Sequence, residues 1–248
     1  MLENRFNLNE EQLIPANTLN GRVLVLAGAG TGKTRVLTSR IYNLLEMGVP
    51  ASNILAITFT NKAANEMKER IARINVNGNN VLACTFHSLC ARILRADGSY
   101  LGYESNFSIY DENDKESLIK NILKSQAASL ISEDDRKAFL KGFMFSVSKA
   151  KTETYKVDKI KANIYVDRFS DEVVGEIFDM YQNELKKANA MDFDDLLLNV
   201  YKLFKEEPKV LEKYQEKYKY IHVDEYQDTN KIQHNIVELL GSKYKNIF

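Results

Sequence analysis

The 248-residue sequence predicts an α/β fold in which a parallel sheet is interrupted by a mainly helical insertion. Short apolar runs rich in β-branched residues alternate with segments of helical periodicity over about the first 110 residues. Nearly continuous apolar runs are typical of strands that a parallel sheet buries on both faces. These strand signals stop after residue 111 and return only near residue 220. The sheet is therefore expected to be discontinuous along the chain.

The first part of the chain is expected to alternate strands with helices. The apolar runs predict strands at residues 23–26, 54–59, 81–85 and 107–110. Apolar residues three and four positions apart predict helices at residues 33–46, 62–74 and 87–96. A strand, a helix and a second strand in this order imply right-handed crossovers.

The later part changes texture twice. Between residues 111 and 213 the chain is rich in charged residues, and helical periodicity predicts helices at 117–123, 173–185 and 193–204. A strand at 220–223, a helix at 232–240 and a short strand at 246–248 are then expected. We expect residues 1–110 and 214–248 to form one sheet domain and residues 111–213 to form an inserted helical domain.

Composition excludes several classes of protein. The chain is 44% hydrophobic, which is enough for a sizeable core, and its two cysteines are too few for a disulfide framework or a four-ligand zinc site. No apolar run approaches the roughly 18 residues of a membrane span. The polar N-terminus does not have the pattern of a secretory signal. We therefore expect a soluble cytoplasmic protein that makes no membrane contact.

Charge predicts at most a local contact with nucleic acid. The 34 Lys and Arg residues balance 34 Asp and Glu residues, so there is no chain-wide basic field. One basic segment contains only the acids Glu153 and Asp158, and its eight basic residues are Arg136, Lys137, Lys141, Lys149, Lys151, Lys156, Lys159 and Lys161. This segment is either a contact patch or simply a solvated lysine-rich helix face.

The strongest local motif lies between a predicted strand and a predicted helix. It consists of Ala27, Gly28, Ala29, Gly30, Thr31, Gly32, Lys33 and Thr34. Glycines let successive backbone N–H groups point at phosphate oxygens, and a helix N-terminus adds partial positive charge. Lys33 is expected to reach the β- and γ-phosphates and Thr34 to bind Mg²⁺. Ala27 replaces the usual first glycine, and a glycine-rich turn without a ligand is the structural alternative.

A phosphate-binding loop needs a carboxylate at the end of a neighbouring strand. Asp224 and Glu225 directly follow the apolar run at residues 220–223. Asp224 is expected to hold Mg²⁺, and Glu225 to orient or deprotonate the attacking water. An acidic pair after a strand is a weak signal alone, because many strands end in acidic turns.

Six segments in the same order resemble motifs of superfamily 1 DNA helicases of the UvrD/PcrA/Rep type. They are residues 8–12, 27–34, 58–64, 85–88, 191–196 and 224–230. The resemblance covers essentially the whole chain. It implies a RecA-like P-loop domain with an inserted helical domain, which uses ATP and Mg²⁺.

The resemblance also implies roles for single residues around the nucleotide. Gln12 is expected to read the adenine, Arg35 to lie on the nucleotide side, and Gln227 to join Lys33 and Glu225 in catalysis. Asn9 and Gln12 also have the spacing of a helix cap, which alone would explain both. Pro15 departs from the family pattern and predicts a short or bent helix.

DNA contacts are implied at the ends of two strands. The residues expected to face a single strand are Phe59, Thr60, Asn61, Thr85, His87 and Ser88. An aromatic ring there stacks on a base, and short polar groups bond to phosphates. Core packing is the alternative for Phe59 and Phe86, and a structural role is the alternative for His87.

The function implied is that of an ATP-dependent DNA helicase that moves 3′ to 5′ on single-stranded DNA and opens duplex junctions in repair or replication. A second RecA-like domain is expected beyond residue 248, so these residues alone are expected to hydrolyse ATP very slowly and to unwind nothing. A helicase–nuclease subunit, a metabolic P-loop ATPase or kinase, and a non-catalytic binding module are the alternatives.

Overall fold

A computed structural model describes residues 6–28, 30–153 and 159–248. The described chain divides into two compact units. The first, called the sheet unit here, comprises residues up to 89 with 207–229 and 236–248. The second, the helical unit, comprises residues 90–206 with 230–235. Both main divisions fall earlier in the chain than the predicted boundaries at 110 and 213.

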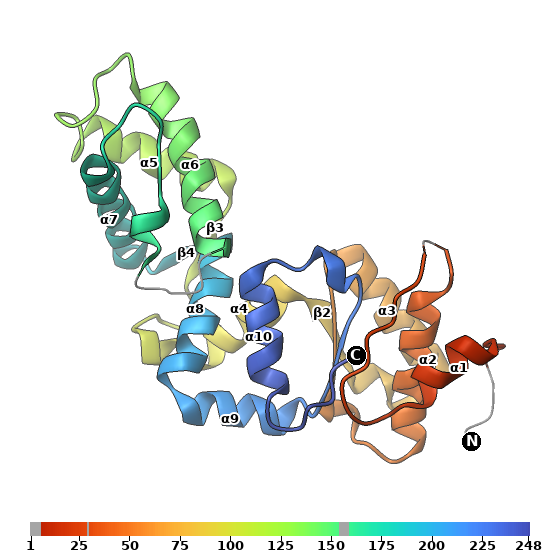
Figure 1. Ribbon diagram of the computed structural model, residues 1–248. Coiled ribbons are helices and arrows are strands. Elements are labelled where there is room, and N and C mark those ends of the chain that lie inside the picture. Colours follow the sequence, from red (N-terminus) through yellow and green to blue (C-terminus); the bar gives the residue numbers. More distant parts are fainter. Residues whose placement is uncertain (1–5, 29, 154–158) are drawn as a thin grey trace. The chain divides into compact units, whose positions relative to one another are not determined.

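The sheet unit contains most of the predicted α/β elements (Figure 1). Its elements are α1 (Glu10–Asn17), α2 (Lys33–Glu46), η1 (Ala51–Asn53), β1 (Ile54–Thr58), α3 (Asn61–Ile74), η2 (Val76–Asn80), β2 (Leu82–Thr85), α9 (Pro208–Lys217), β5 (Tyr220–Val223) and η6 (Tyr226–Asp228). Two helices, α4 (Phe86–Asp97) and α10 (Lys231–Gly241), carry the chain between the units.

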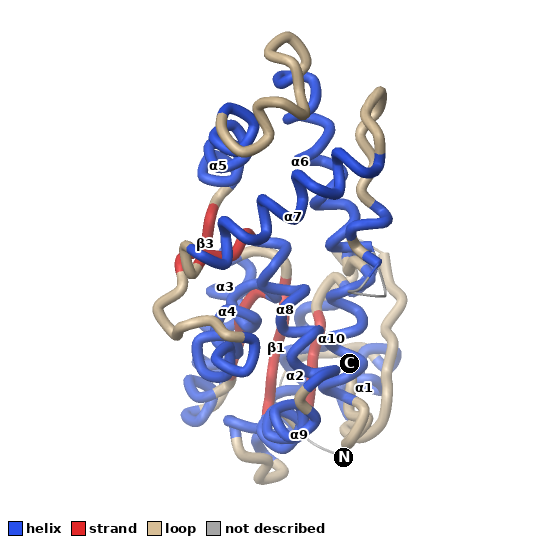
Figure 2. Tube along the Cα trace, turned by 90° about the vertical axis from the view of Figure 1, so that its left-hand side faces the viewer, coloured by secondary structure: helices blue, strands red, loops and turns tan. Residues whose placement is uncertain are grey.

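The helical unit is built from helices and a small sheet. Its elements are η3 (Gly98–Leu101), β3 (Ser108–Tyr110), α5 (Glu112–Lys124), α6 (Arg136–Glu153), η5 (Lys161–Asn163), α7 (Asp171–Lys187), β4 (Ala190–Asp192) and α8 (Phe193–Glu206). Figure 2 shows α5, α6 and α7 as long helical tubes. The predicted helices of this region fall within α5, α7 and α8. No helix in the described part of the chain is long and apolar enough to cross a membrane.

The predicted parallel sheet is confirmed. Its three strands have the order β2-β1-β5, and β1 pairs in parallel with both neighbours. All five residues of β1 are buried, because it is the central strand and helices cover it. This explains the continuous apolar run that predicted it.

The prediction of a strand at residues 23–26 is wrong. Only Arg22 forms an isolated bridge, to Ile247, and the Val23 N–H donates to the Ile247 carbonyl at 2.9 Å. Among the described residues, Leu24–Leu26 form no ladder with another strand. Leu24 is 68% exposed and Leu26 is 85% exposed.

The strand predicted at 107–110 forms, but in a different sheet. It is β3, which pairs in parallel with β4 in a separate two-stranded sheet. The apolar run predicted a strand correctly. It did not predict the partner strand β4, which lies about 80 residues later in the chain. The units consequently divide before β3.

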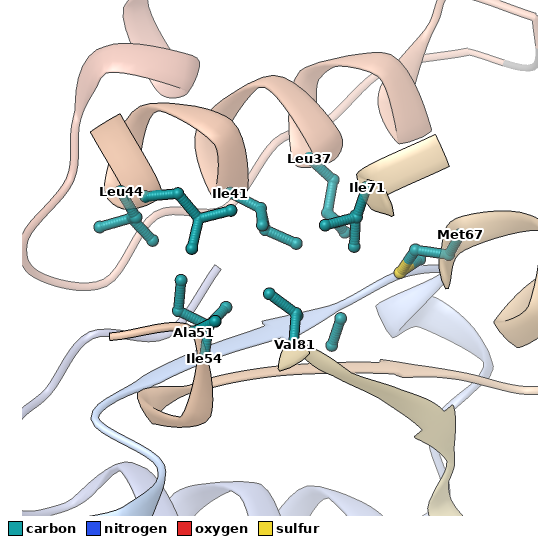
Figure 3. Packing of buried hydrophobic residues seen from close by; sticks show 10 residues of the cluster. Leu37, Ile41, Leu44, Ala51, Ile54, Met67, Ile71 and Val81 are labelled. Carbon is teal, nitrogen blue, oxygen red and sulfur yellow. The ribbon is translucent and has the colours of Figure 1, made fainter. Parts of the chain in front are cut away.

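The core of the sheet unit lies between α2, α3 and the sheet (Figure 3). Leu37, Ile41 and Leu44 recur three and four positions apart on α2, so they share one face of the helix. They pack with Ile54 of β1 and with Ile71 of α3. Each fully buried aliphatic side chain contributes about 1.5–3 kcal/mol, and this face fixes α2 against the sheet.

A buried polar pair interrupts this apolar interior. Arg40 of α2 is 1% exposed, and its Nε–H donates to Nε2 of His222 in β5 at 3.3 Å. Since Nε2 accepts, the neutral ring carries its proton on Nδ1, which lies 3.4 Å from the Leu55 carbonyl. Burial, and then the Arg40 charge, lower the pKa of His222 to about 3. The Arg40 guanidinium also lies over the Phe248 ring, 4.9 Å from its centroid.

A buried ion cluster holds the helical unit together. Lys151 Nζ lies 2.6 Å from Asp192 Oδ2 and 2.7 Å from Asp195 Oδ1, and none of these side chains is more than 4% exposed. The Tyr181 hydroxyl donates to Asp192 at 2.8 Å. Burial and then Asp192 raise the pKa of Asp195. Burial by itself would raise the pKa of Asp192 as well. The charge of Lys151 and its hydrogen bond outweigh burial, so the pKa of Asp192 lies below its usual range.

The ion cluster shows that the basic residues between Arg136 and Lys161 do not all lie on one exposed face. Lys151 belongs neither to a contact patch nor to a solvated face, because α6 turns it into the interior. Lys161 pairs with Asp179, and Arg136 lies 3.5 Å from Glu133. Lys156 and Asp158 lie outside the described residues. Three exposed lysines of α6 are left: Lys137, Lys141 and Lys149.

His222 predicts a pH dependence of stability. Its folded pKa is about 3, below the ordinary value of 6.5, so the unfolded chain binds the proton more tightly. The stabilisation is present above pH 6.5 and is lost as the pH falls toward 3. Between pH 7 and pH 5 this group should lower the free energy of unfolding by about 2 kcal/mol. His222→Gln still accepts from Arg40 but does not titrate, so urea unfolding should show a weaker acid dependence; an unchanged dependence would contradict the assignment.

Lys151 predicts a large loss of stability on substitution. Lys151→Met leaves two buried carboxylates without their cation, and breaking such a pair costs about 3–5 kcal/mol. Lys149→Met, on the exposed face of the same helix, is the matched control and should change stability by no more than about 0.5 kcal/mol. Urea unfolding of both variants measures the difference. Equal midpoints would show that the cluster is not structural.

Candidate functional site

The predicted phosphate-binding loop leads directly into α2. Gly32 is the N-cap of that helix and has a φ of 89°, in the left-handed region. A Cβ at this position would also lie 3.1 Å from Gln12 Nε2, so both conformation and space favour glycine. Gly30 has a φ of 74°, and Ala29 lies outside the described residues. The glycine pattern therefore has a local conformational reason.

Lys33, the first residue of α2, lies over the loop. Its Nζ donates to the carbonyls of Ala27 and Gly28, each at 3.2 Å, and the Thr31 hydroxyl donates to the Gly28 carbonyl at 2.8 Å. The first turn of a helix also leaves backbone N–H groups without helical partners. Positive charge and N–H donors are thus concentrated at the start of α2, as an anion requires.

The carboxylate predicted to accompany the loop lies beside it. The Asp224 N–H continues the ladder by donating to the Ile57 carbonyl at 2.9 Å, which places Asp224 at the end of β5. The Thr34 hydroxyl donates to Asp224 Oδ2 at 3.2 Å. Burial raises the pKa of Asp224. The two residues predicted to bind Mg²⁺ are therefore brought together across 190 positions of sequence.

These oxygens fit a magnesium ion of the kind that nucleotides carry. A hydroxyl and a carboxylate are hard oxygen donors, and Mg²⁺ is usually held by one or two protein oxygens together with phosphates and water. Within the described ranges, no three His, Cys, Asp or Glu side chains gather into a metal cage. The donor set suits an ion that shares its coordination with a phosphate.

Glu225 has a strained backbone. Its φ is 53° and its ψ is 46°, in the left-handed region that non-glycine residues seldom adopt. Such a conformation costs about 1–3 kcal/mol and is often found at functional sites. Gln227 Nε2 donates to Glu225 Oε2 at 2.5 Å, and the Glu225 N–H donates to Asp224 Oδ1 at 3.2 Å. The two hydrogen bonds fix the carboxylate beside the end of β5.

The predicted catalytic residues line a cavity of about 470 Å³. Lys33, Glu225 and Gln227 line it together with Asp224. The exposed leucines of residues 24–26, with Val223 and Phe248, form an apolar wall. Arg22 and Glu238 form a bidentate ion pair at 3.0 and 2.8 Å on its lining.

Gln12 has the helix-capping role, which was one of the two alternatives that its sequence context left open. It forms a capping box with Asn9, in which Gln12 N–H donates at 2.8 Å and Asn9 N–H donates at 3.1 Å. Its Nε2 also donates to the Thr31 carbonyl at 2.8 Å, so it contacts the loop itself. Helix α1 is short and contains Pro15. Neither Gln12 nor Arg35, which is exposed, lines the cavity.

The predicted DNA contacts lie at the carboxyl ends of β1 and β2. These strands are adjacent and parallel, with Thr58 opposite Thr85, so residues 59–61 and 85–88 follow the same edge of the sheet. Phe59 is half-buried, with its ring centroid 5.8 Å from that of Phe86. Phe86 is 1% exposed, which favours the core alternative for that ring.

Several polar groups of this edge already serve as helix caps. The Thr60 hydroxyl accepts from the Ala63 N–H at 3.1 Å at the start of α3. The Thr85 hydroxyl accepts from the Ser88 N–H at 3.2 Å and donates to the Ser88 hydroxyl at 2.9 Å. Asn61 is exposed, and His87 and Ser88 are half-buried.

The sequence reasoning missed the Arg40–His222 pair beneath β5. The available signal was the position of Arg40 within the apolar face of α2, where a charge is costly unless it has partners. The pair joins α2 to β5 two residues before Asp224 and so helps to hold the two elements that carry the site.

Comparison with known proteins agrees with the motifs. The UvrD/REP helicase N-terminal domain family matches residues 8–248. The ATP-dependent DNA helicase PcrA of Staphylococcus aureus is 44% identical over 245 residues, which is 97% of this chain and 32% of the relative. PcrA of Staphylococcus epidermidis is 44% identical over 243 residues, with the same shares covered. The chain thus spans about a third of the length of these relatives. The resemblance inferred from the motifs is confirmed, and this chain belongs to the UvrD/REP helicase N-terminal domain family.

Proposed function

We propose that the sheet unit is a RecA-like P-loop domain that binds ATP with Mg²⁺. The observation that carries this proposal is the Thr34–Asp224 hydrogen bond, which joins the start of α2 to the end of β5. In an open α/β sheet, ligands bind at the carboxyl ends of the strands, where both residues lie. The boundaries predicted from the sequence, residues 1–110 with 214–248 for the RecA-like domain and 111–213 for the helical insertion, stay a proposal that differs from the limits of the two compact units.

The proposed reaction is phosphoryl transfer to water. Lys33 exchanges its bonds to the Ala27 and Gly28 carbonyls for bonds to the phosphates, which offsets their charge. Thr34 and Asp224 hold Mg²⁺, which supplies further neutralisation of phosphate charge when bound. A water oxygen attacks the γ-phosphorus, its proton passes to the Glu225 carboxylate, and the bond to ADP breaks. Gln227 holds Glu225 in position for that transfer.

The carboxyl edge of β1 and β2 is proposed to bind single-stranded DNA. Phe59 keeps part of its ring accessible while its other side packs on Phe86, so a base can stack on it. Thr60, Asn61, Thr85, His87 and Ser88 are proposed as the polar contacts of this edge. Stimulation of ATP hydrolysis by single-stranded DNA would separate this function from that of a metabolic P-loop ATPase.

The activity of the whole relatives is a further part of the proposal. It comprises 3′ to 5′ movement, opening of duplex junctions and a cytoplasmic role in repair or replication. Residues 1–248 alone are proposed to hydrolyse ATP slowly and to unwind nothing, because unwinding needs two domains that close and open around ATP. ATP-dependent strand displacement by the purified chain would contradict this part.

The nucleotide site predicts different effects for Lys33 and Glu225. Lys33→Ala removes a charge-assisted contact worth about 1.5–3 kcal/mol, so the affinity for ATP–Mg²⁺ should fall at least about tenfold. Glu225→Gln should leave the affinity nearly unchanged and lower turnover about 10²- to 10⁴-fold. Lys68→Ala, at an exposed position of α3, is the control. Calorimetry measures the affinities. Equal affinity of Lys33→Ala and wild type for ATP–Mg²⁺ would contradict the assignment of residues 27–34 as a phosphate-binding loop.

The DNA edge predicts a cost when the Phe59 ring is removed. Phe59→Ala should weaken binding of oligothymidylate by about 1–3 kcal/mol, whatever the sequence of the strand. Phe59→Leu retains an apolar side chain against Phe86, so it separates the effect of stacking from the effect of packing. Fluorescence anisotropy measures affinity and a thermal melt measures folding. Tight binding by a folded Phe59→Leu variant would show that the ring packs and does not stack.

A further inference from the structure

The ion cluster of the helical unit holds more carboxylates than cations. Lys151 of α6 lies 2.6 Å from Asp192 of β4 and 2.7 Å from Asp195 of α8, so one ammonium group is shared between two acids. These side chains are 0%, 2% and 4% exposed. Water is therefore not available to compensate the second negative charge, and a buried charge that lacks a counter-ion is costly. Both acids belong to residues 191–196, a motif segment that takes no part in the proposed nucleotide and DNA sites.

A second buried lysine does not restore the balance, because it lies beside further acids. Lys115 of α5 is 1% exposed and lies 3.9 Å from Asp194, whose side chain is only 16% exposed. Lys115 also lies 3.7 Å from Glu112, which is largely exposed to water. With Lys115 and Asp194 included, two ammonium groups face three aspartate carboxylates. One proton would balance this set.

Hydrogen bonds indicate which acid carries that proton. Asp192 accepts from the Tyr181 hydroxyl and from the Asp195 N–H, each at 2.8 Å, and both bonds stabilise its charged form. Asp195 in return accepts from the Asp192 N–H at 3.3 Å, which is a longer and weaker bond. Burial, and then the Asp192 charge, raise the pKa of Asp195 to about 7. Burial also raises the pKa values of Tyr181 and Tyr103, so both hydroxyls keep their protons.

We propose that the Asp195 carboxyl is a proton-operated switch, which holds the helical unit closed while it is protonated and loosens the unit when it releases the proton. The cluster ties α6 to α7, β4 and α8. When the proton passes to water, two neighbouring carboxylates repel each other around a single ammonium group. Separation of α8 from α6 admits water to the new charge and relieves this repulsion. The switch lies within the helical unit and does not depend on the proposed nucleotide site.

The pH dependence of the switch is opposite in sign to that of His222 in the sheet unit. The folded pKa of Asp195, about 7, lies above the ordinary value of 3.8. Its stabilisation is therefore complete below about pH 3.8 and is lost as the pH rises through about 7. The stabilisation from a neutral His222 is instead lost as the pH falls toward 3. Mild alkali should loosen the helical unit, whereas mild acid should loosen the sheet unit.

Carbon-13 NMR of the whole chain, labelled at its aspartate carboxyl carbons, measures this proton without any substitution. The Asp195 signal is assigned through its own backbone and followed from about pH 4 to about pH 9. Its midpoint is expected near pH 7, about three units above the ordinary value of an aspartate. A midpoint below about pH 6, or a carboxyl that remains protonated up to about pH 9, would overturn the proposal.

Hydrogen exchange measured by mass spectrometry tests whether the proton controls the packing of the helical unit. With intrinsic exchange rates taken into account, opening of α6 and α8 should be about tenfold more frequent at about pH 8 than at about pH 6. Asp195→Asn keeps the size of the side chain but does not ionise, so it should remove this difference. Asp167→Asn removes an exposed carboxylate of the same unit and, as the matched control, should keep it. Equal protection of α6 and α8 at the two pH values in the wild-type chain, or an unchanged difference in a folded Asp195→Asn variant, would show that the proton is no switch.

Discussion

The hydrogen bond between Thr34 and Asp224 is the contact on which the candidate site depends. It requires α2 to begin at the end of β5, and a parallel sheet meets that requirement because all its strands end at one edge. The loop before α2 can then supply N–H groups and Lys33, while the turn after β5 supplies Glu225. The left-handed backbone of Glu225 is a local cost, and the packed core between α2 and the sheet offsets it. The apolar face of α2 is thus a precondition for the chemistry proposed at its N-terminus.

Each unit also contains a buried polar group that a purely apolar core would not need. In the sheet unit Arg40 bonds to a neutral His222 of β5, and in the helical unit Lys151 bridges Asp192 and Asp195. Such groups add little net stability, since their desolvation costs about as much as their attraction returns. They do penalise any shift of register, because a displaced partner leaves an unpaired buried group. We infer that both sets of contacts fix the orientation of the helix that carries them.

The sequence predicts best where local chemistry and burial agree. Gly30 and Gly32 before α2 have positive φ, and the continuous apolar run of β1 corresponds to a strand that is buried throughout. It predicts poorly where a partner distant in sequence decides the outcome. Residues 23–26 have strand texture, but within the described residues they pair only at the first of them, with Ile247. Lys151 looks like its exposed neighbours in composition, and only the positions of Asp192 and Asp195 show that it is buried.

The same distinction bears on how the chain can contact a nucleic acid. At the sheet edge the Thr85 hydroxyl donates its proton to Ser88, whereas the Thr60 hydroxyl accepts a capping bond and keeps its proton for a phosphate. Affinity there must come mainly from the Phe59 ring and from groups such as Asn61. Phosphate contacts dominate affinity and its dependence on salt. Of the residues proposed to contact DNA at the sheet edge, none is a lysine or an arginine, so binding there should depend only weakly on salt.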